Sequence, residues 1–267
     1  MGNNPIILTR NLTRRFGRVT AVDRLNLSIE AGEVFGLLGR NGAGKTTVIK
    51  MLTTLLLPNA GHATVAGYDI ITHPAAVRRI IGYVPQALSA DGELTGYENL
   101  LIFARLFDIP YTQREVRIRE ALAFMGLTEV ADQLVKSYSG GMIRKLEIAQ
   151  STLHQPQVLF LDEPTVGLDP LARHTIWELL ERFQREYGST ILLTTHYLEE
   201  AERLCDRVAI MNRGSVVAIG TPGELKARIG VATLEDVFAH YTGDLADGKN
   251  AAYDETSQIR RAIRRLG

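Results

Sequence analysis

The sequence predicts an α/β fold that combines a mostly parallel sheet with an α-helical insertion. Two continuous apolar runs, at 158–163 and 190–195, are typical of central parallel strands, which are buried on both faces. A third strand, at 33–38, leads into a segment with apolar residues at helical spacing. From about residue 87 to 154 the pattern is that of helices alone, which indicates an inserted subdomain.

Composition limits the classes of protein that fit. Of the 267 residues, 45% are hydrophobic and 22% charged, as in an ordinary globular domain with a sizeable core. The 30 basic and 30 acidic residues cancel, which argues against a surface for nucleic acid. Cys205 is the one cysteine, so we expect no intrachain disulfide, a reducing compartment and a place in the core. No apolar run is long enough to span a bilayer and no signal peptide is evident, so a membrane role is expected only through a partner.

A glycine-rich segment has the form G-x-x-x-x-G-K-[ST] and consists of Gly39, Arg40, Asn41, Gly42, Ala43, Gly44, Lys45, Thr46 and Thr47. A glycine-rich turn is the simpler explanation, but the strand before it and the helix after it favour a phosphate-binding loop. Glycines let backbone N–H groups approach an anion, and the helix N-terminus adds positive potential. Lys45 is expected to reach the β and γ phosphates, and the Thr46 hydroxyl to bind Mg²⁺.

The segments on either side of this loop are predicted to be short strands, at 6–9, 25–30, 62–67 and 81–84, with a short helix at 77–81. Phe16 lies on a polar connection, where two interpretations stand equally: an anchor in the core, or a flat face on which a purine stacks. Gln86 follows the strand that Pro85 ends. It is either an ordinary loop residue or a ligand for Mg²⁺ or water.

The helical insertion starts with a capping box, Thr95 to Glu98, and continues with a second helix at 114–125. A third helix opens at Ser139, Gly140 and Gly141 and has apolar residues on one face. Its N-terminus is a second potential anion-binding site.

Two carboxylates, Asp162 and Glu163, end the apolar strand at 158–163. They could cap a helix or form a surface pair, but a strand that carries them straight out of the core favours a functional site. Asp162 is expected to support Mg²⁺, and Glu163 to polarise an attacking water.

Two further polar residues follow at the ends of elements. Asp169 precedes Pro170, and an N-cap of the next helix is a sufficient explanation for it. His196 ends the strand at 190–195, at the edge where parallel sheets bind ligands, although a lone histidine is more often structural. The sequence then predicts a helix at 198–204, strands at 207–212 and 215–219, and a capping box from Thr221 to Glu224.

In order and spacing, these motifs resemble those of the nucleotide-binding subunit of ABC transporters, over about residues 5–230. Residues 39–47 match Walker A, and 159–163 match Walker B with its adjoining glutamate. The other matches are the A-loop aromatic Phe16, the Q-loop Gln86, the signature Ser139-Gly140-Gly141, the D-loop Gly167-Leu168-Asp169 and the switch residue His196. The resemblance implies that these residues bind ATP and Mg²⁺, with Lys45, Gln86, Glu163 and His196 acting in hydrolysis.

The resemblance also implies a P-loop NTPase core with a mostly parallel sheet, an N-terminal antiparallel β subdomain and an inserted α-helical subdomain. Residues 1–230 then form the ATP-binding domain, with the insertion at about 87–154, and 231–267 form a C-terminal extension. Such a subunit is peripheral, on the cytoplasmic face of the plasma membrane. It works with a separate membrane permease, whose coupling helix enters a groove near Gln86.

The signature departs from the usual Leu-Ser-Gly-Gly-Gln of the family, because the chain has Tyr138-Ser139-Gly140-Gly141-Met142. Met142 cannot form the hydrogen bonds of glutamine, but the serine and both glycines that make the anion-binding N-terminus are present. This form is similar to that of the exporter branch with daunorubicin-type drug, polysaccharide and lipid-linked substrates. The segment at 233–238, followed by Thr242 and Gly243, also resembles the ending of that branch.

The two anion-binding elements predict the quaternary state. The phosphate loop already surrounds a phosphate chain from one side, so Ser139 of the same subunit is not needed there. We therefore expect a head-to-tail dimer, with each ATP between the loop of one subunit and Ser139 of a second copy or a homologous subunit.

Two other functions compete with export. A non-transport ABC ATPase that acts on nucleic acid or ribosomes usually has two cassettes or a long coiled coil, and the sequence has neither. An importer ATPase differs in its membrane partner. At the C-terminus, Ile259, Ile263 and Leu266 share one face among four arginines, which fits a basic amphipathic helix at a membrane or partner, or a frayed, solvated end.

Overall fold

The structure is a computed structural model and describes residues 5–243. The larger of two sheets has the strand order β10-β9-β3-β8-β7-β6, and all its neighbouring strands are parallel except β9 and β10. Its strands are β3 (Val34–Leu38), β6 (Ile81–Val84), β7 (Val158–Asp162), β8 (Thr190–Thr195), β9 (Arg207–Asn212) and β10 (Ser215–Gly220). The smaller, antiparallel sheet has the order β2-β1-β4-β5. It contains β1 (Ile7–Phe16), β2 (Val19–Ile29), β4 (Ala60–Val65) and β5 (Tyr68–Asp69).

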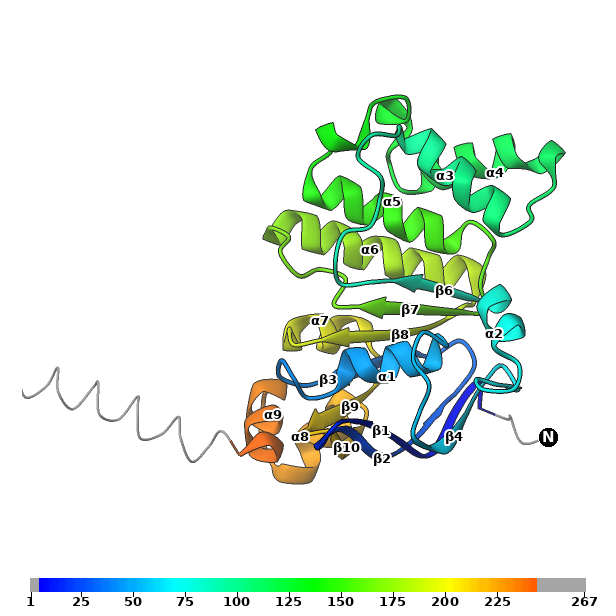
Figure 1. Ribbon diagram of the computed structural model, residues 1–267. Helices are drawn as coiled ribbons and strands as arrows, with labels where there is room; N and C mark the ends of the chain where they lie inside the picture. The colour runs from blue at the N-terminus through cyan, green and yellow to red at the C-terminus, as the bar shows by residue number, and fades with distance from the viewer. Residues whose placement is uncertain (1–4, 244–267) are drawn as a thin grey trace, which may run out of the picture.

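The helices cover both faces of the larger sheet and form the predicted insertion. They are α1 (Lys45–Leu52), α2 (Pro74–Ile80), α3 (Gly96–Leu106), α4 (Tyr111–Phe124), α5 (Gly140–Thr152), α6 (Pro170–Tyr187), α7 (Leu198–Leu204), α8 (Pro222–Ile229) and α9 (Leu234–Thr242), with short 3₁₀ turns at Thr128–Val130 and Val135–Ser137. Figure 1 shows α3, α4 and α5 gathered beyond the β6 edge, while the small sheet lies on the β9–β10 side. This arrangement confirms the predicted fold class.

Two hydrophobic clusters hold the layers together, one on each face of the larger sheet. Successive residues of β7 alternate between them: Leu159 and Leu161 face the cluster with α5 and α6, whereas Phe160 faces the cluster with α1 and the small sheet. All three are fully buried, as a strand covered on both faces requires. Cys205 is also buried, and its Sγ lies only 2.7 Å from where a Cβ on Gly36 would stand, which confirms its predicted place in the core.

The N-terminal strands are longer than the sequence pattern indicates. β1 runs on to Phe16, which pairs with Val19 across a hairpin, so Phe16 does not lie on a polar connection. Register shifts in β1 after Thr9 and Leu12 interrupt the alternation that the prediction of a strand at 6–9 used. With 48% of its surface exposed, Phe16 is not a core anchor, and that interpretation is wrong.

The capping boxes that were predicted from Thr95 and Thr221 are both present, at the starts of α3 and α8. α9 packs on α8 and β9 and buries Leu234 and Val237 completely, so the segment after residue 230 is part of the same core. The features predicted at 259–266 lie outside the described residues.

Stability is expected to fall in acid because of His154, which follows α5. Its ring stacks on Phe107 with centroids 3.6 Å apart, and burial lowers its pKa from 6.5 to about 4. The unfolded chain therefore takes up this proton first, and stability is lost as the pH falls from 6.5 towards 4. Between pH 7 and 5 we expect His154 to lower the free energy of unfolding by about 2 kcal/mol.

Urea unfolding of the wild type and His154→Gln at both pH values measures this effect, because glutamine does not titrate. Between pH 7 and 5, the free energy of unfolding of the variant should fall by about 2 kcal/mol less than that of the wild type. Equal pH dependence in the two proteins would contradict the assignment to His154.

Candidate nucleotide-binding site

The phosphate loop joins the end of β3 to the start of α1. Gly44 has φ +106°, and a Cβ there would lie 2.3 Å from the carbonyl oxygen of Ala21, so glycine is required. No side chain of the described residues caps the N-terminus of α1, and its first turn has no acidic residue. The N–H groups and the positive end of this helix are therefore left for an anion.

Glu163 is the centre of a cluster of four predicted site residues. Its Oε1 lies 3.0 Å from Nζ of Lys45, and its Oε2 accepts a hydrogen bond from Nε2 of Gln86 at 3.3 Å. Nδ1 of His196 is 3.1 Å from the same Oε2. The Lys45 and Glu163 side chains are only 4% and 6% exposed, so water screens their attraction little.

The backbone of Glu163 is left-handed, with φ +49°, which is uncommon outside glycine and concentrates at functional sites. Its N–H donates to Oγ1 of Thr194 at 3.0 Å, and the Thr194 hydroxyl donates to Oδ1 of Asp162 at 2.7 Å. From β8, Thr194 thus orients the carboxylate of Asp162 and holds the backbone of Glu163. Sequence reasoning missed this residue, although a hydroxyl near the end of a buried strand was a usable signal.

Two of the three residues that were predicted to bind Mg²⁺ are in direct contact. Oγ1 of Thr46 donates to Oδ1 of Asp162 at 3.0 Å, and the third, Gln86, contacts Glu163, the residue that follows Asp162. No group of three His, Cys, Asp or Glu residues in the described chain could hold a metal by itself. One carboxylate, one hydroxyl and one amide nonetheless fit Mg²⁺, which takes its remaining ligands from water and phosphates. Burial and the charge of Asp162 raise the pKa of nearby Tyr83 to about 12, so its phenol stays neutral.

A cavity of about 400 Å³ opens over this cluster, within the size range of small-molecule sites. It is lined by Phe16, Ala21, Arg40, Asn41, Gly42, Ala43, Gly44, Lys45, Thr46, Thr47, Gln86 and Glu163. The half-exposed ring of Phe16 and the phosphate loop therefore border the same space.

Seven predicted site residues do not line this cavity. Gly39 begins the phosphate loop, and Asp162 and His196 contact the lining residues Thr46 and Glu163. The other four are Ser139, Gly140, Gly141 and Asp169. They lie together elsewhere, because a Cβ on Gly141 would stand 3.0 Å from Cβ of Ala172, in the first turn of the helix that Asp169 caps. Ser139 and Asp169 are exposed. Oγ of Ser139 accepts from the backbone N–H of Met142, so this cap does not depend on the Met142 side chain.

A protein-family model described as ABC transporter matches residues 22–166, which is more than half of the chain. The chain belongs to the ABC transporter family. This ABC ATPase is 46% identical over 228 residues to the daunorubicin/doxorubicin resistance ATP-binding protein of Streptomyces peucetius, covering 85% of this chain and 69% of the relative. It is 45% identical over 225 residues to the Nod factor export ATP-binding protein I of Ralstonia nicotianae, covering 84% and 70%. A linearmycin resistance ATP-binding protein of Bacillus subtilis is 39% identical over 229 residues, with coverage of 86% and 73%.

Solved structures give the same family. The ABC ATPase superposes on an ATP-binding subunit of an ABC transporter with a TM-score of 0.80, at 30% identity over 88% of this chain and 99% of that one. It matches cbiO1 of Clostridium perfringens, part of the ABC transporter complex cbiONQ, with a TM-score of 0.76 at 29% identity over 85% and 92%. No helix in residues 5–243 of the ABC ATPase is both long and apolar enough to cross a membrane.

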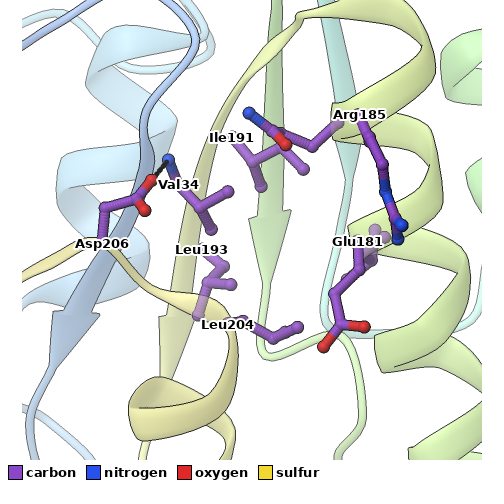
Figure 2. Close-up of a pocket in the computed structure, with 9 residues that line it drawn as sticks. Val34, Glu181, Arg185, Ile191, Leu193, Leu204 and Asp206 are labelled. Atoms are coloured by element: carbon purple, nitrogen blue, oxygen red, sulfur yellow. Dashed lines mark hydrogen bonds between the residues drawn. The ribbon is translucent and has the colours of Figure 1, made fainter.

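A second cavity of the ABC ATPase, of about 370 Å³, lies between α6 and the amino-terminal ends of β3 and β8 (Figure 2). Both of its acidic residues form internal contacts: Asp206 accepts from the Val34 N–H at 2.8 Å, and Glu181 accepts from Arg203 at 2.9 Å. Parallel sheets bind ligands at the carboxyl ends of their strands, so this cavity is not the candidate site.

Glu200 on α7 is another residue that sequence reasoning missed. Its Oε1 accepts hydrogen bonds from Thr165 at 2.7 Å and Trp177 at 2.8 Å, and burial raises its pKa. Glu200 thereby links the helix after His196 to the segment after Glu163. A glutamate within an acidic helix has no sequence signal that distinguishes it from its exposed neighbours.

Proposed function

We propose that this chain is the ATP-hydrolysing subunit of an exporter, in which ATP-driven pairing of two ATPase subunits works a separate membrane permease. The observation that carries the proposal is the cluster of Lys45, Gln86 and His196 around the Glu163 carboxylate, beside a phosphate loop and under a cavity of nucleotide size. The drug-resistance and Nod-factor export relatives support export over import or action on nucleic acid.

ATP would lie in the cavity with its adenine on the exposed ring of Phe16 and its phosphates in the loop at 39–47. Lys45 would bind the β and γ phosphates, and its buried position makes that attraction strong. Mg²⁺ would be held by Thr46, Gln86 and Asp162. When bound, it would neutralise part of the negative charge on the phosphate oxygens.

Glu163 would orient and polarise the attacking water. Thr194 holds its left-handed backbone, and His196 contacts one oxygen of its carboxylate. The pair between Lys45 and Glu163 has to open as the γ phosphate enters between them, so ATP binding would release the carboxylate to act on water.

A second copy, or a homologous subunit, would complete the site. Ser139, Gly140 and Asp169 are exposed and lie outside the cavity of their own subunit, so they are available to the nucleotide of a partner. The N-terminus of α5 would then contribute a second set of donors to the phosphates. This arrangement supports the head-to-tail dimer.

The permease would dock in an apolar groove of about 270 Å³ between α3, β6 and the segment after α1. Leu55 and Leu106 line it and are 60% and 68% exposed, which is high for leucines with no partner to cover them. Tyr83 also lines the groove and lies three residues before Gln86, so a short stretch of chain connects the groove to the nucleotide cluster. An apolar helix of a membrane subunit fits this surface, and would hold the ATPase at the cytoplasmic face of the membrane.

Affinity purification of the native complex from its own host tests the proposal. We expect a multi-span membrane protein to accompany the ATPase, and Leu106→Asp to reduce its recovery at least about tenfold, since burying an unpaired charge in a groove costs more than 1.4 kcal/mol. Val116→Asp, on an exposed face of α4 that does not line the groove, is the matched control. Recovery of ribosomes or nucleic acid in place of a permease would refute the export function.

A further inference from the structure

A buried ion pair on α5 takes no part in the nucleotide cluster. Nη1 of Arg144 lies 2.9 Å from Oε2 of Glu147, and both side chains are 2% exposed. Buried charges are retained only where other polar groups satisfy them. The groups that satisfy this pair indicate what it does.

Both partners bind the segment that carries Gln86. Arg144 donates from Nη1 to the carbonyl of Pro85 at 2.7 Å and from Nη2 to the carbonyl of Gln86 at 2.8 Å. Oε1 of Glu147 accepts from the backbone N–H of Ser89 and from its hydroxyl at 3.1 Å. The pair is therefore hydrogen-bonded to both ends of the segment 85–89.

This segment has no helical or strand structure of its own, since it lies between the end of β6 and the start of α3. Its shape thus depends strongly on contacts with other elements. Gln86 is exposed at one end of it, and only the amide of this side chain reaches Glu163, at 3.3 Å. A small displacement of the segment would move that amide out of reach.

Helix α5, which carries Arg144 and Glu147, is capped at its N-terminus by Ser139. Ser139 is the residue that faces the partner subunit in the proposed dimer. We propose that Arg144 and Glu147 are positioning residues that hold the Gln86 amide against Glu163 and make it move together with the N-terminus of α5. The inference rests on the proposed roles of Gln86 and Ser139. The planar guanidinium of Arg144 is essential to this role, because it donates hydrogen bonds to two adjacent backbone carbonyls at once.

Steady-state ATP hydrolysis by the full chain with Mg²⁺ tests the inference. Arg144→Lys keeps the charge but cannot donate along two fixed directions, so we expect kcat to fall about tenfold with KM changed less than twofold, as for a misplaced catalytic group. Because Arg144 acts through Gln86, the double variant Arg144→Lys/Gln86→Ala should be no slower than Gln86→Ala alone. Arg119→Lys, in an exposed ion pair of the same helical subdomain, should behave as wild type.

Ser89→Ala is a second, milder variant that leaves the buried pair intact and changes only an exposed side chain. It removes one bond to Glu147 and should lower kcat about two- to threefold, again only when Gln86 is present. This variant decides the question if Arg144→Lys does not fold.

Three outcomes overturn the inference. One is an unchanged kcat in folded Arg144→Lys, and another is an equal fractional loss with and without Gln86, which would show a purely structural role. Wild-type turnover of Gln86→Ala overturns the role of Gln86 as well. Failure to recover a permease bears instead on the export function and leaves these kinetics unaffected.

Discussion

Replacing Lys45 by alanine is expected to reduce ATP hydrolysis about 10³-fold, equivalent to about 4 kcal/mol of transition-state stabilisation. Lys45 is a cation that lines the cavity at the phosphate loop, and its side chain is almost fully shielded from water. A buried positive charge at the γ phosphate stabilises the transition state far more than an exposed one. Phosphate release at saturating ATP measures the effect.

Lys50→Ala is the matched control, since Lys50 lies on the same helix but is exposed. It should retain wild-type turnover. Lys45→Ala also leaves Glu163 without its cation, so the melting temperature of the variant must be measured, and Lys45→Ala/Glu163→Gln removes both charges if the single variant is unstable. Near-native turnover in folded Lys45→Ala would refute the assignment of the loop.

Glu163→Gln is expected to lower hydrolysis about 10³-fold and to trap an ATP-bound dimer. The amide keeps hydrogen-bonding capacity towards Gln86 and His196 but cannot polarise water as a carboxylate does. It also removes the anionic partner of Lys45, which frees the ammonium for the γ phosphate and should raise ATP affinity. Light scattering with Mg²⁺ and ATP should therefore give twice the chain mass of 29.5 kDa.

Two controls separate this dimer from nonspecific association. ADP in place of ATP should leave Glu163→Gln monomeric, and so should adding Ser139→Arg, which places a bulky charge at the exposed N-terminus of α5. A monomer at saturating ATP would contradict the head-to-tail arrangement, as would a dimer that is indifferent to Ser139→Arg.

The elements with a strong local pattern could be predicted from the sequence. The strand β7 and the loop before α1 depend on residues that are neighbours in the chain, as do the capping boxes at Thr95 and Thr221. The second half of β1 could not be found in this way, because its register shifts disturb the alternation and its pairing with β2 and β4 decides its conformation. Phe16 was ambiguous for the same reason.

The sequence by itself determined the family of this protein and predicted its chemistry, because each motif has its candidate phosphate, metal or water-activating residues within a few positions of one another. Only the tertiary structure decided the contacts within the site: it places Lys45, Gln86 and His196 on the Glu163 carboxylate. It alone shows Arg144 and Glu147 buried against the segment of Gln86, since two charged residues in a helix are usually solvated. The physical reason is that burial and side-chain pairing depend on contacts between elements far apart in the chain, on which local spacing carries no information.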